Sequence, residues 1–266
     1  MFEAIRLWAL KIRVQLAAQI ALVATYRAEV VLWALSGTLP IIMMGLWTKA
    51  ATDAPAGITP VQMVRYFAAV LLVRQMTFVW VIWEFEQDVM QGHLSHFLLR
   101  PFSPIWHYIA GHIGERLVRL PVVLALIGLC FALYPSAAFV PSLSDLLLGF
   151  AVIAFVLLTR FVMQLASAMM CFYTDRASNI ETLQFTAYMF LSGAIAPLEM
   201  FPPQVRAFAE LTPYPYFVYL PARILMGEPA PVAQGFTVMT LWGLVFLGLQ
   251  QIGWRRGLRH YSSYGA

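Results

Sequence analysis

Long uncharged stretches recur along the chain, and most charged residues lie between them. A helix needs roughly 20 mainly apolar residues to cross a hydrocarbon core of about 30 Å. Stretches of this kind, or slightly shorter, cover residues 30–47, 66–83, a segment ending in 120–134, 146–173, 183–198 and 236–254. The pattern therefore predicts an all-α, polytopic membrane protein with six transmembrane helices.

Composition supports this fold class. Of the 266 residues, 61% are apolar and 11% are charged, whereas soluble domains have about 45–50% and about 25%. The net charge of +4 fits basic residues beside membrane spans, so no nucleic-acid partner is expected. No extramembrane stretch is long enough to fold separately, which predicts one transmembrane domain over residues 1–266.

The first 27 residues predict a helix that lies in the membrane interface. At 100° per residue, their charges fall within about one third of the helix circumference; they are Glu3, Arg6, Arg13 and Arg27. Lys11 falls outside that sector, so a lead-in to the first span stays open as an alternative.

Six spans place both termini on one side of the membrane, and the positive-inside rule makes that side cytoplasmic. The basic residues assigned to it are Arg6, Lys11, Arg13, Arg100, Arg116, Arg119, Arg176, Arg255, Arg256 and Arg259.

The sequence gives little support for a catalytic or metal-binding site. The lysines, Lys11 and Lys49, follow Leu and Thr rather than Gly, so the chain lacks the phosphate-binding loop of an ATPase. Two pairs, His93 with His96 and His112 with Glu115, offer two ligands each, whereas zinc sites need three or four. We interpret them as polar residues on an exposed helix and expect neither a metal site nor an enzyme.

Two arginines lie inside predicted spans, Arg160 in the fourth and Arg74 in the second. A charge at the bilayer centre costs about 2.5–3.5 kcal/mol on insertion scales, so such residues usually face the bundle interior or a cavity. Arg160 fits a translocation path and a buried pair, with a carbonyl or with a carboxylate such as Glu181 or Glu199, equally well. For Arg74 a structural role is favoured, either such a pair or snorkelling toward an interface.

The polar stretch between the second and third spans carries the most specific pattern: Glu84, Glu86, Asp88, Val89, Gly92, Leu94, Leu98, Leu99, Arg100 and Pro101. It resembles the segment of type-2 ABC (ATP-binding cassette) exporter permeases in which an acidic residue precedes Gly-x-Leu and Leu-Leu-x-Pro. Residues 192–225 are similar to that family's Ser-Gly, Pro-Leu and Pro stretch. The resemblance implies a cytoplasmic coupling helix over 84–101 that offers carboxylates to an ATPase, and a re-entrant helical hairpin over 192–225 on the outer side.

The resemblance also implies partners. These are a P-loop ATPase subunit that binds Mg-ATP, a second permease subunit in a homodimer or heterodimer, and membrane lipid; this chain itself binds no cofactor. We expect a bacterial inner membrane and export of an amphipathic or hydrophobic substrate, such as a lipid-linked molecule, peptide or drug. Glu199 and Pro197 either line an outer gate or cap a helix.

Two other functions remain as alternatives. An ion- or proton-coupled transporter would be expected to carry acidic residues in its spans, where this sequence has arginine. A membrane-embedded enzyme needs a convergent polar set within one leaflet, and the sequence does not suggest one.

Overall fold

A computed structural model describes residues 2–53, 58–100, 103–174 and 176–261. The side chains of residues 2–9 and of several further positions up to 53, including Arg27, lie outside this description, as do Met1 and Pro101. The described residues form helices and no strand, which confirms the all-α prediction.

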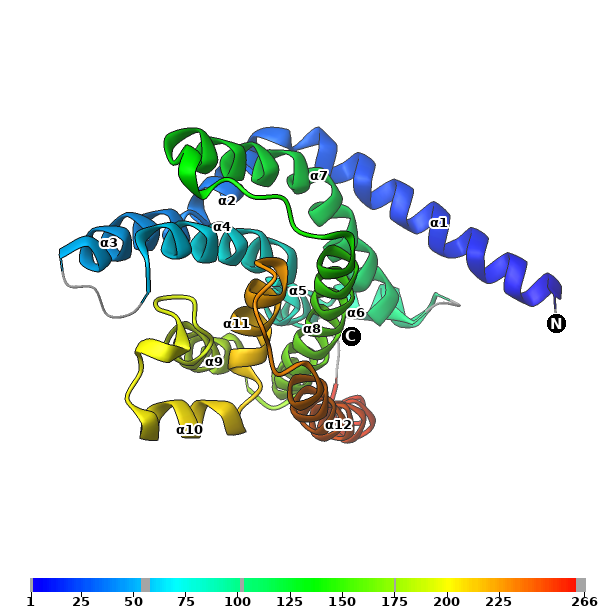
Figure 1. The fold of residues 1–266 in the computed structure, drawn as a ribbon. Helices are drawn as coiled ribbons and strands as arrows, with labels where there is room; N and C mark the ends of the chain where they lie inside the picture. The colour runs from blue at the N-terminus through cyan, green and yellow to red at the C-terminus, as the bar shows by residue number, and fades with distance from the viewer. Residues whose placement is uncertain (1, 54–57, 101–102, 175, 262–266) are drawn as a thin grey trace.

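Figure 1 shows the helices in order. They are α1 (Phe2–Thr25), α2 (Arg27–Ser36), α3 (Leu39–Asp53), α4 (Pro60–Thr77), α5 (Val81–Met90), α6 (His93–Leu98), α7 (Pro104–Leu133), α8 (Leu143–Ala168), α9 (Ser178–Leu191), α10 (Pro203–Leu211), α11 (Tyr214–Leu225) and α12 (Val232–Gly257), with short 3-10 turns η1 (Pro135–Ala137), η2 (Met169–Phe172) and η3 (Leu198–Met200).

Among the described residues, four helical stretches are long and apolar enough to cross a membrane: Pro60–Met90, Pro104–Leu133, Leu143–Phe172 and Val232–Gly257. They correspond to the second, third, fourth and sixth predicted spans. The third helix does begin well before residue 120, within the basic segment, as its sequence indicated.

The first and fifth predicted spans differ from expectation. The first consists of two helices, α2 and α3, because the helix is interrupted at Gly37 and Thr38. Pro40 follows the break and has no N–H to donate into the preceding turn. The fifth, α9, has 14 residues, about 21 Å of helix, and it ends before Gly193, whose φ of +87° favours glycine.

The helical bundle has two ends, which are distinguished by the contacts found there. At one end, which we call the α6 end, Phe85 of α5 packs on Phe172 and on Trp254 near the end of α12. At the opposite end, Arg65 of α4 donates to the carbonyl of Ala137 in η1. Helix α1 lies along α7, where Gln15 bonds His107, and then extends away from the bundle (Figure 1). Its position in the membrane interface stays a prediction.

The segment after α9 is irregular and yet covered by protein. The Tyr66 hydroxyl donates to the Gly193 carbonyl at 2.8 Å, and the Tyr219 amide donates to the Ser192 carbonyl at 3.1 Å. Helix α11 lies in the core, where Phe217 is fully buried. Non-helical backbone at membrane depth is tolerated only with such cover, so α10 and α11 suit the predicted hairpin over 192–225, whose depth stays a prediction.

The second span contains a break between α4 and α5 that side chains of α7 hold. Arg116 donates from Nε to the Met76 carbonyl at 2.6 Å and from Nη2 to the Phe78 carbonyl. His112 accepts the backbone N–H of Trp80 on Nε2 at 3.2 Å. Helix ends leave backbone groups without partners, and α7 supplies partners on both sides of this break.

Arg116→Met is expected to lower the free energy of unfolding by about 3 kcal/mol, because buried carbonyls left without donors cost about 1–3 kcal/mol each. Thermal unfolding of the purified chain in mild detergent measures the change. Arg259→Met, at an exposed position, is the matched control and should stay within about 0.5 kcal/mol of the wild type. Equal melting temperatures for the two variants would show that Arg116 does not hold the break.

Candidate functional site

The predicted coupling segment consists of the second half of α5, a turn at Gly92 and α6. Gly92 adopts the left-handed conformation, with φ of +75°, which lets the chain reverse between the helices. Val89 and Leu94 are buried in an apolar cluster with Phe85. The segment is therefore fixed to the bundle by its apolar residues.

Two of its acidic residues bind other parts of the chain. Glu86 accepts the backbone N–H of Ser178 at 2.7 Å and its hydroxyl at 3.0 Å, so it caps the start of α9. Asp88 accepts the Tyr108 hydroxyl of α7 at 2.7 Å, and His93 Nδ1 lies 3.6 Å away. These carboxylates attach α5 to α9 and α7, a structural role that the sequence did not indicate, while contact with an ATPase stays a prediction.

Apart from Gln87 and Gln91, the exposed residues of the segment are apolar or basic. We call these apolar and basic residues the α6 surface; its members are Met90, His93, His96, Leu98, Leu99 and Arg100. Leu99 is 86% exposed, and the Arg100 guanidinium lies 4.9 Å from the Phe97 ring centroid. Two exposed leucines beside a cation form a surface suited to a partner.

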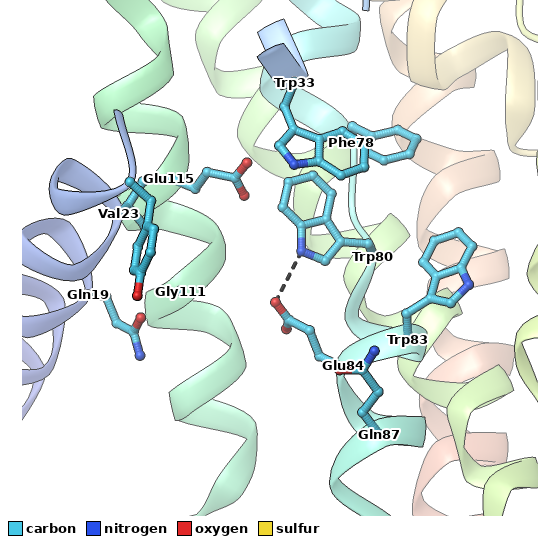
Figure 2. A pocket seen from close by; sticks show the side chains of 11 residues that line it. Gln19, Val23, Trp33, Phe78, Trp80, Trp83, Glu84, Gln87, Gly111 and Glu115 are labelled. Carbon is cyan, nitrogen blue, oxygen red and sulfur yellow. Dashed lines mark hydrogen bonds between the residues drawn. The ribbon is translucent and has the colours of Figure 1, made fainter. Parts of the chain in front are cut away.

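A cavity of about 660 Å³ lies between α5, α7 and the first two helices. Figure 2 shows Trp33, Phe78, Trp80 and Trp83 on one side of a gap and Gln19, Val23 and Glu115 on the other. We call it the aromatic cavity; its lining residues are Gln19, Val23, Tyr26, Trp33, Phe78, Trp80, Trp83, Glu84, Gln87, Gly111 and Glu115. Its volume falls within the range of about 300–1,000 Å³ typical of small-molecule sites.

The two carboxylates of the aromatic cavity differ in charge balance. Glu115 forms an ion pair with Arg119 one helical turn away. Glu84 points into the gap and accepts the indole N–H of Trp80 at 3.1 Å (Figure 2). Its side chain is 39% exposed. It forms no ion pair with a described lysine or arginine, although it interacts electrostatically with Arg116.

His112 does not balance Glu84, although its Nδ1 lies 3.7 Å from the carboxylate. Its Nε2 accepts the Trp80 N–H, so Nδ1 carries the proton and donates to the Tyr108 carbonyl at 2.9 Å. With both nitrogens used in this way, the ring is neutral. The prediction of an exposed pair is wrong for His112, which is 2% exposed, because α7 continues the third span through it.

A second cavity of about 200 Å³ shares Trp33, Phe78 and Trp80 with the first. Arg74 and Arg119 line it, and the Arg119 guanidinium lies 5.3 Å from the Trp80 ring centroid. Arg116 and Arg119 are thus buried among helices. The positive-inside assignment had treated them as charges that flank the membrane, and the structure does not place them on the surface.

Arg160 is 4% exposed and is surrounded by aromatic rings. Its guanidinium lies 4.3 Å from the Tyr188 ring centroid, 5.7 Å from that of Phe78 and 5.8 Å from that of Phe217. Cation–π contacts of this kind are worth about 2 kcal/mol or more when desolvated. Among the described residues no carboxylate forms an ion pair with Arg160, which was one of the alternatives, although Glu181 lines the same small cavity and interacts with Arg160 electrostatically. A role of Arg160 in the path stays a prediction.

The residues predicted for an outer gate lie together at the opposite end. Glu199 accepts hydrogen bonds from the hydroxyl of Tyr219 and the guanidinium of Arg223. Arg223 Nε also lies 3.2 Å from Glu228 Oε2. Pro197 precedes η3 and lines, with Glu199, a cavity of about 290 Å³. Glu199 therefore binds Arg223 and not Arg160.

Sequence reasoning missed the aromatic cavity. Trp80 and Trp83 stand in the run TFVWVIWE at residues 77–84, and this density of aromatic residues beside a glutamate is the available signal. Trp33 comes from a different helix, so only the fold brings it within 6.4 Å of Trp80, ring to ring.

Comparison with known proteins gives one family. The model of a family described as "ABC-2 family transporter protein" matches residues 20–265. A search of curated proteins found no match.

Glu86→Ala is expected to destabilise the isolated chain by about 1 kcal/mol, the typical loss for a helix N-cap. Gln87→Ala, at the neighbouring exposed position, is the control and should change little. Thermal unfolding without any partner measures both, and equal midpoints would leave Glu86 free for a role in partner binding.

Proposed function

Because the chain belongs to the ABC-2 transporter family, we propose that it is the membrane-spanning subunit of an exporter and that a separate P-loop ATPase binds Mg-ATP and supplies the energy. The absence of Gly-Lys-Ser/Thr from the sequence agrees with hydrolysis in a partner. Family membership favours this function over the two alternatives, an ion-coupled transporter and a membrane-embedded enzyme.

We propose the α6 surface as the ATPase contact. The observation that carries this proposal is that α5 joins the α6 surface to the aromatic cavity within one helix. Trp83, Glu84 and Gln87 line the cavity, and Met90 of the same helix belongs to the surface. A displacement of α6 therefore acts directly on the cavity wall, while the Asp88–Tyr108 bond carries it to α7.

The aromatic cavity supports an amphipathic or hydrophobic substrate. Its lining combines large apolar rings with a few polar groups, the usual composition of a small-molecule site. A second permease subunit, identical or related, would complete the translocation path. The exposed apolar faces of α7 and α12 leave room for both lipid and such a subunit.

We propose that the α6 end is cytoplasmic and that the membrane is a bacterial inner membrane. Basic residues gather at this end: Arg100, Arg176, Arg255, Arg256 and Arg259. The positive-inside rule favours that orientation. Tyr261 bonds Ser95 of α6 at 3.1 Å, which places the last described residue on the same side.

Affinity purification from native membranes in mild detergent tests the proposal as a whole. We expect a P-loop ATPase to co-elute in stoichiometric amounts, together with a second permease copy or a related chain, identified by mass spectrometry. A chain that elutes alone and transports in vesicles under an ion gradient without ATP would contradict the exporter.

The double variant Leu98→Glu/Leu99→Glu should reduce the captured ATPase at least tenfold, because two new charges would be buried in the proposed contact. Val205→Glu, an exposed apolar position on α10, is the control and should capture the ATPase as the wild type does. Undiminished capture by the double variant, with normal yield of the chain, would place the ATPase contact elsewhere.

A further inference from the structure

We propose that the aromatic cavity selects organic cations with an apolar body, such as tetraarylphosphonium or quaternary ammonium compounds. This inference rests on the proposed function, since it assigns a substrate class to the site that the exporter would load. It goes beyond a generally hydrophobic substrate because it specifies the sign of the charge.

The rings of the cavity provide faces that attract cations. Trp33 and Trp80 stack with centroids 6.4 Å apart and planes inclined by 27°, and Phe78 lies 5.6 Å from Trp80. Trp83 stands beyond Trp80 on the same side of the gap (Figure 2). Tryptophan is the strongest aromatic partner for cations, and quaternary ammonium groups are commonly bound by several rings together.

The protein already uses one of these rings in this way. The guanidinium of Arg119 lies 5.3 Å from the Trp80 ring centroid, within the adjoining cavity. Its charge is balanced by Glu115. The wall between the two cavities thus holds one cation that is paired with a carboxylate, while the Glu84 carboxyl group of the larger cavity forms no ion pair with a described lysine or arginine.

Glu84 supplies the charge selection. It accepts one hydrogen bond from Trp80, and its neighbour His112 is neutral. None of the described lining residues is basic; Gln19 and Gln87 are uncharged amides. An anion would face the Glu84 carboxyl group, and Arg119, the cation of the adjoining wall, is already paired with Glu115, whereas an organic cation would give Glu84 a partner of opposite charge.

The position of Glu84 fits the loading side of an exporter. It lies on α5 between Trp80 and the α6 surface, one turn before Asp88, which holds α5 to α7. A cation bound to Glu84 therefore contacts the helix that the ATPase is proposed to move. Binding and energy input would meet on α5.

Isothermal titration of the purified chain in an uncharged maltoside detergent tests the inference with two probes of the same shape and opposite charge. We expect tetraphenylphosphonium to bind and tetraphenylborate to show no heat beyond the detergent blank. Glu84→Gln keeps an acceptor for Trp80 and should weaken tetraphenylphosphonium about tenfold, the effect of losing about 1.4 kcal/mol. Glu210→Gln, on α10 outside the cavity, should bind as the wild type does.

Trp83→Leu is a second test that leaves the charge intact, and it should weaken tetraphenylphosphonium severalfold through the lost ring. Unchanged melting temperatures confirm that both cavity variants fold. Equal binding of the two probes, or a folded Glu84→Gln that binds the cation as well as the wild type, would overturn the inference.

The outcomes separate this inference from the exporter proposal. Cation binding that depends on Glu84, without ATP-driven transport by the purified complex, would keep the cation site and contradict the exporter. ATP-driven transport that is indifferent to Glu84 would do the reverse. Phosphatidylethanolamine as a competitor, with phosphatidylglycerol as its control, decides the source of the cation: displacement assigns the site to a lipid amine, and its absence to a free molecule.

Discussion

The rest of this structure depends on the hydrogen bonds that side chains of α7 form with the backbone at the interruption of the second span. A polypeptide inside a bilayer cannot leave amides and carbonyls without partners, and between Thr77 and Val81 the helix does interrupt its own ladder. Arg116 has a planar group with several donors and can serve separate carbonyls at once. It bonds Met76 and Phe78 while His112 serves Trp80, and this leaves α5 free to begin in a new direction.

That new direction creates the cavity. Phe78 and Trp80 stand at the break itself, and both cavities are lined by these two rings. The other break, at Gly37 in the first span, faces the smaller cavity, with Trp33 one turn before it. The interruptions of the first and second spans therefore lie close together, beside the cavities that α1 and α7 also line. The carboxylates and arginines of this region surround these cavities.

Part of this arrangement could be predicted from sequence, because uninterrupted apolar runs longer than the bilayer thickness have few other structures available. The break in the first span had a local signal in Gly37 and Pro40, which the apolar run concealed. The break in the second had none, since TFVWVIWE contains neither Gly nor Pro, and its cause lies more than 30 residues away in His112 and Arg116.

The carboxylates of α5 were predictable only in part. Glu86 points about 200° around the helix from Glu84 and Asp88, so helix geometry alone excludes a common acidic face for the three. Which carboxylate would remain unpaired depended on Arg119 and His112, whose positions only the fold determines.

The hydrogen bond between Ser95 and Tyr261 has a practical consequence. It brings the last described residue of the chain onto the short helix whose surface is proposed to receive an ATPase. A fluorophore attached at position 261 would lie beside that surface from the start, and its emission would register the arrival of a partner or a tilt of α6. The same closeness means that a bulky group at position 261 would compete with a partner for this surface.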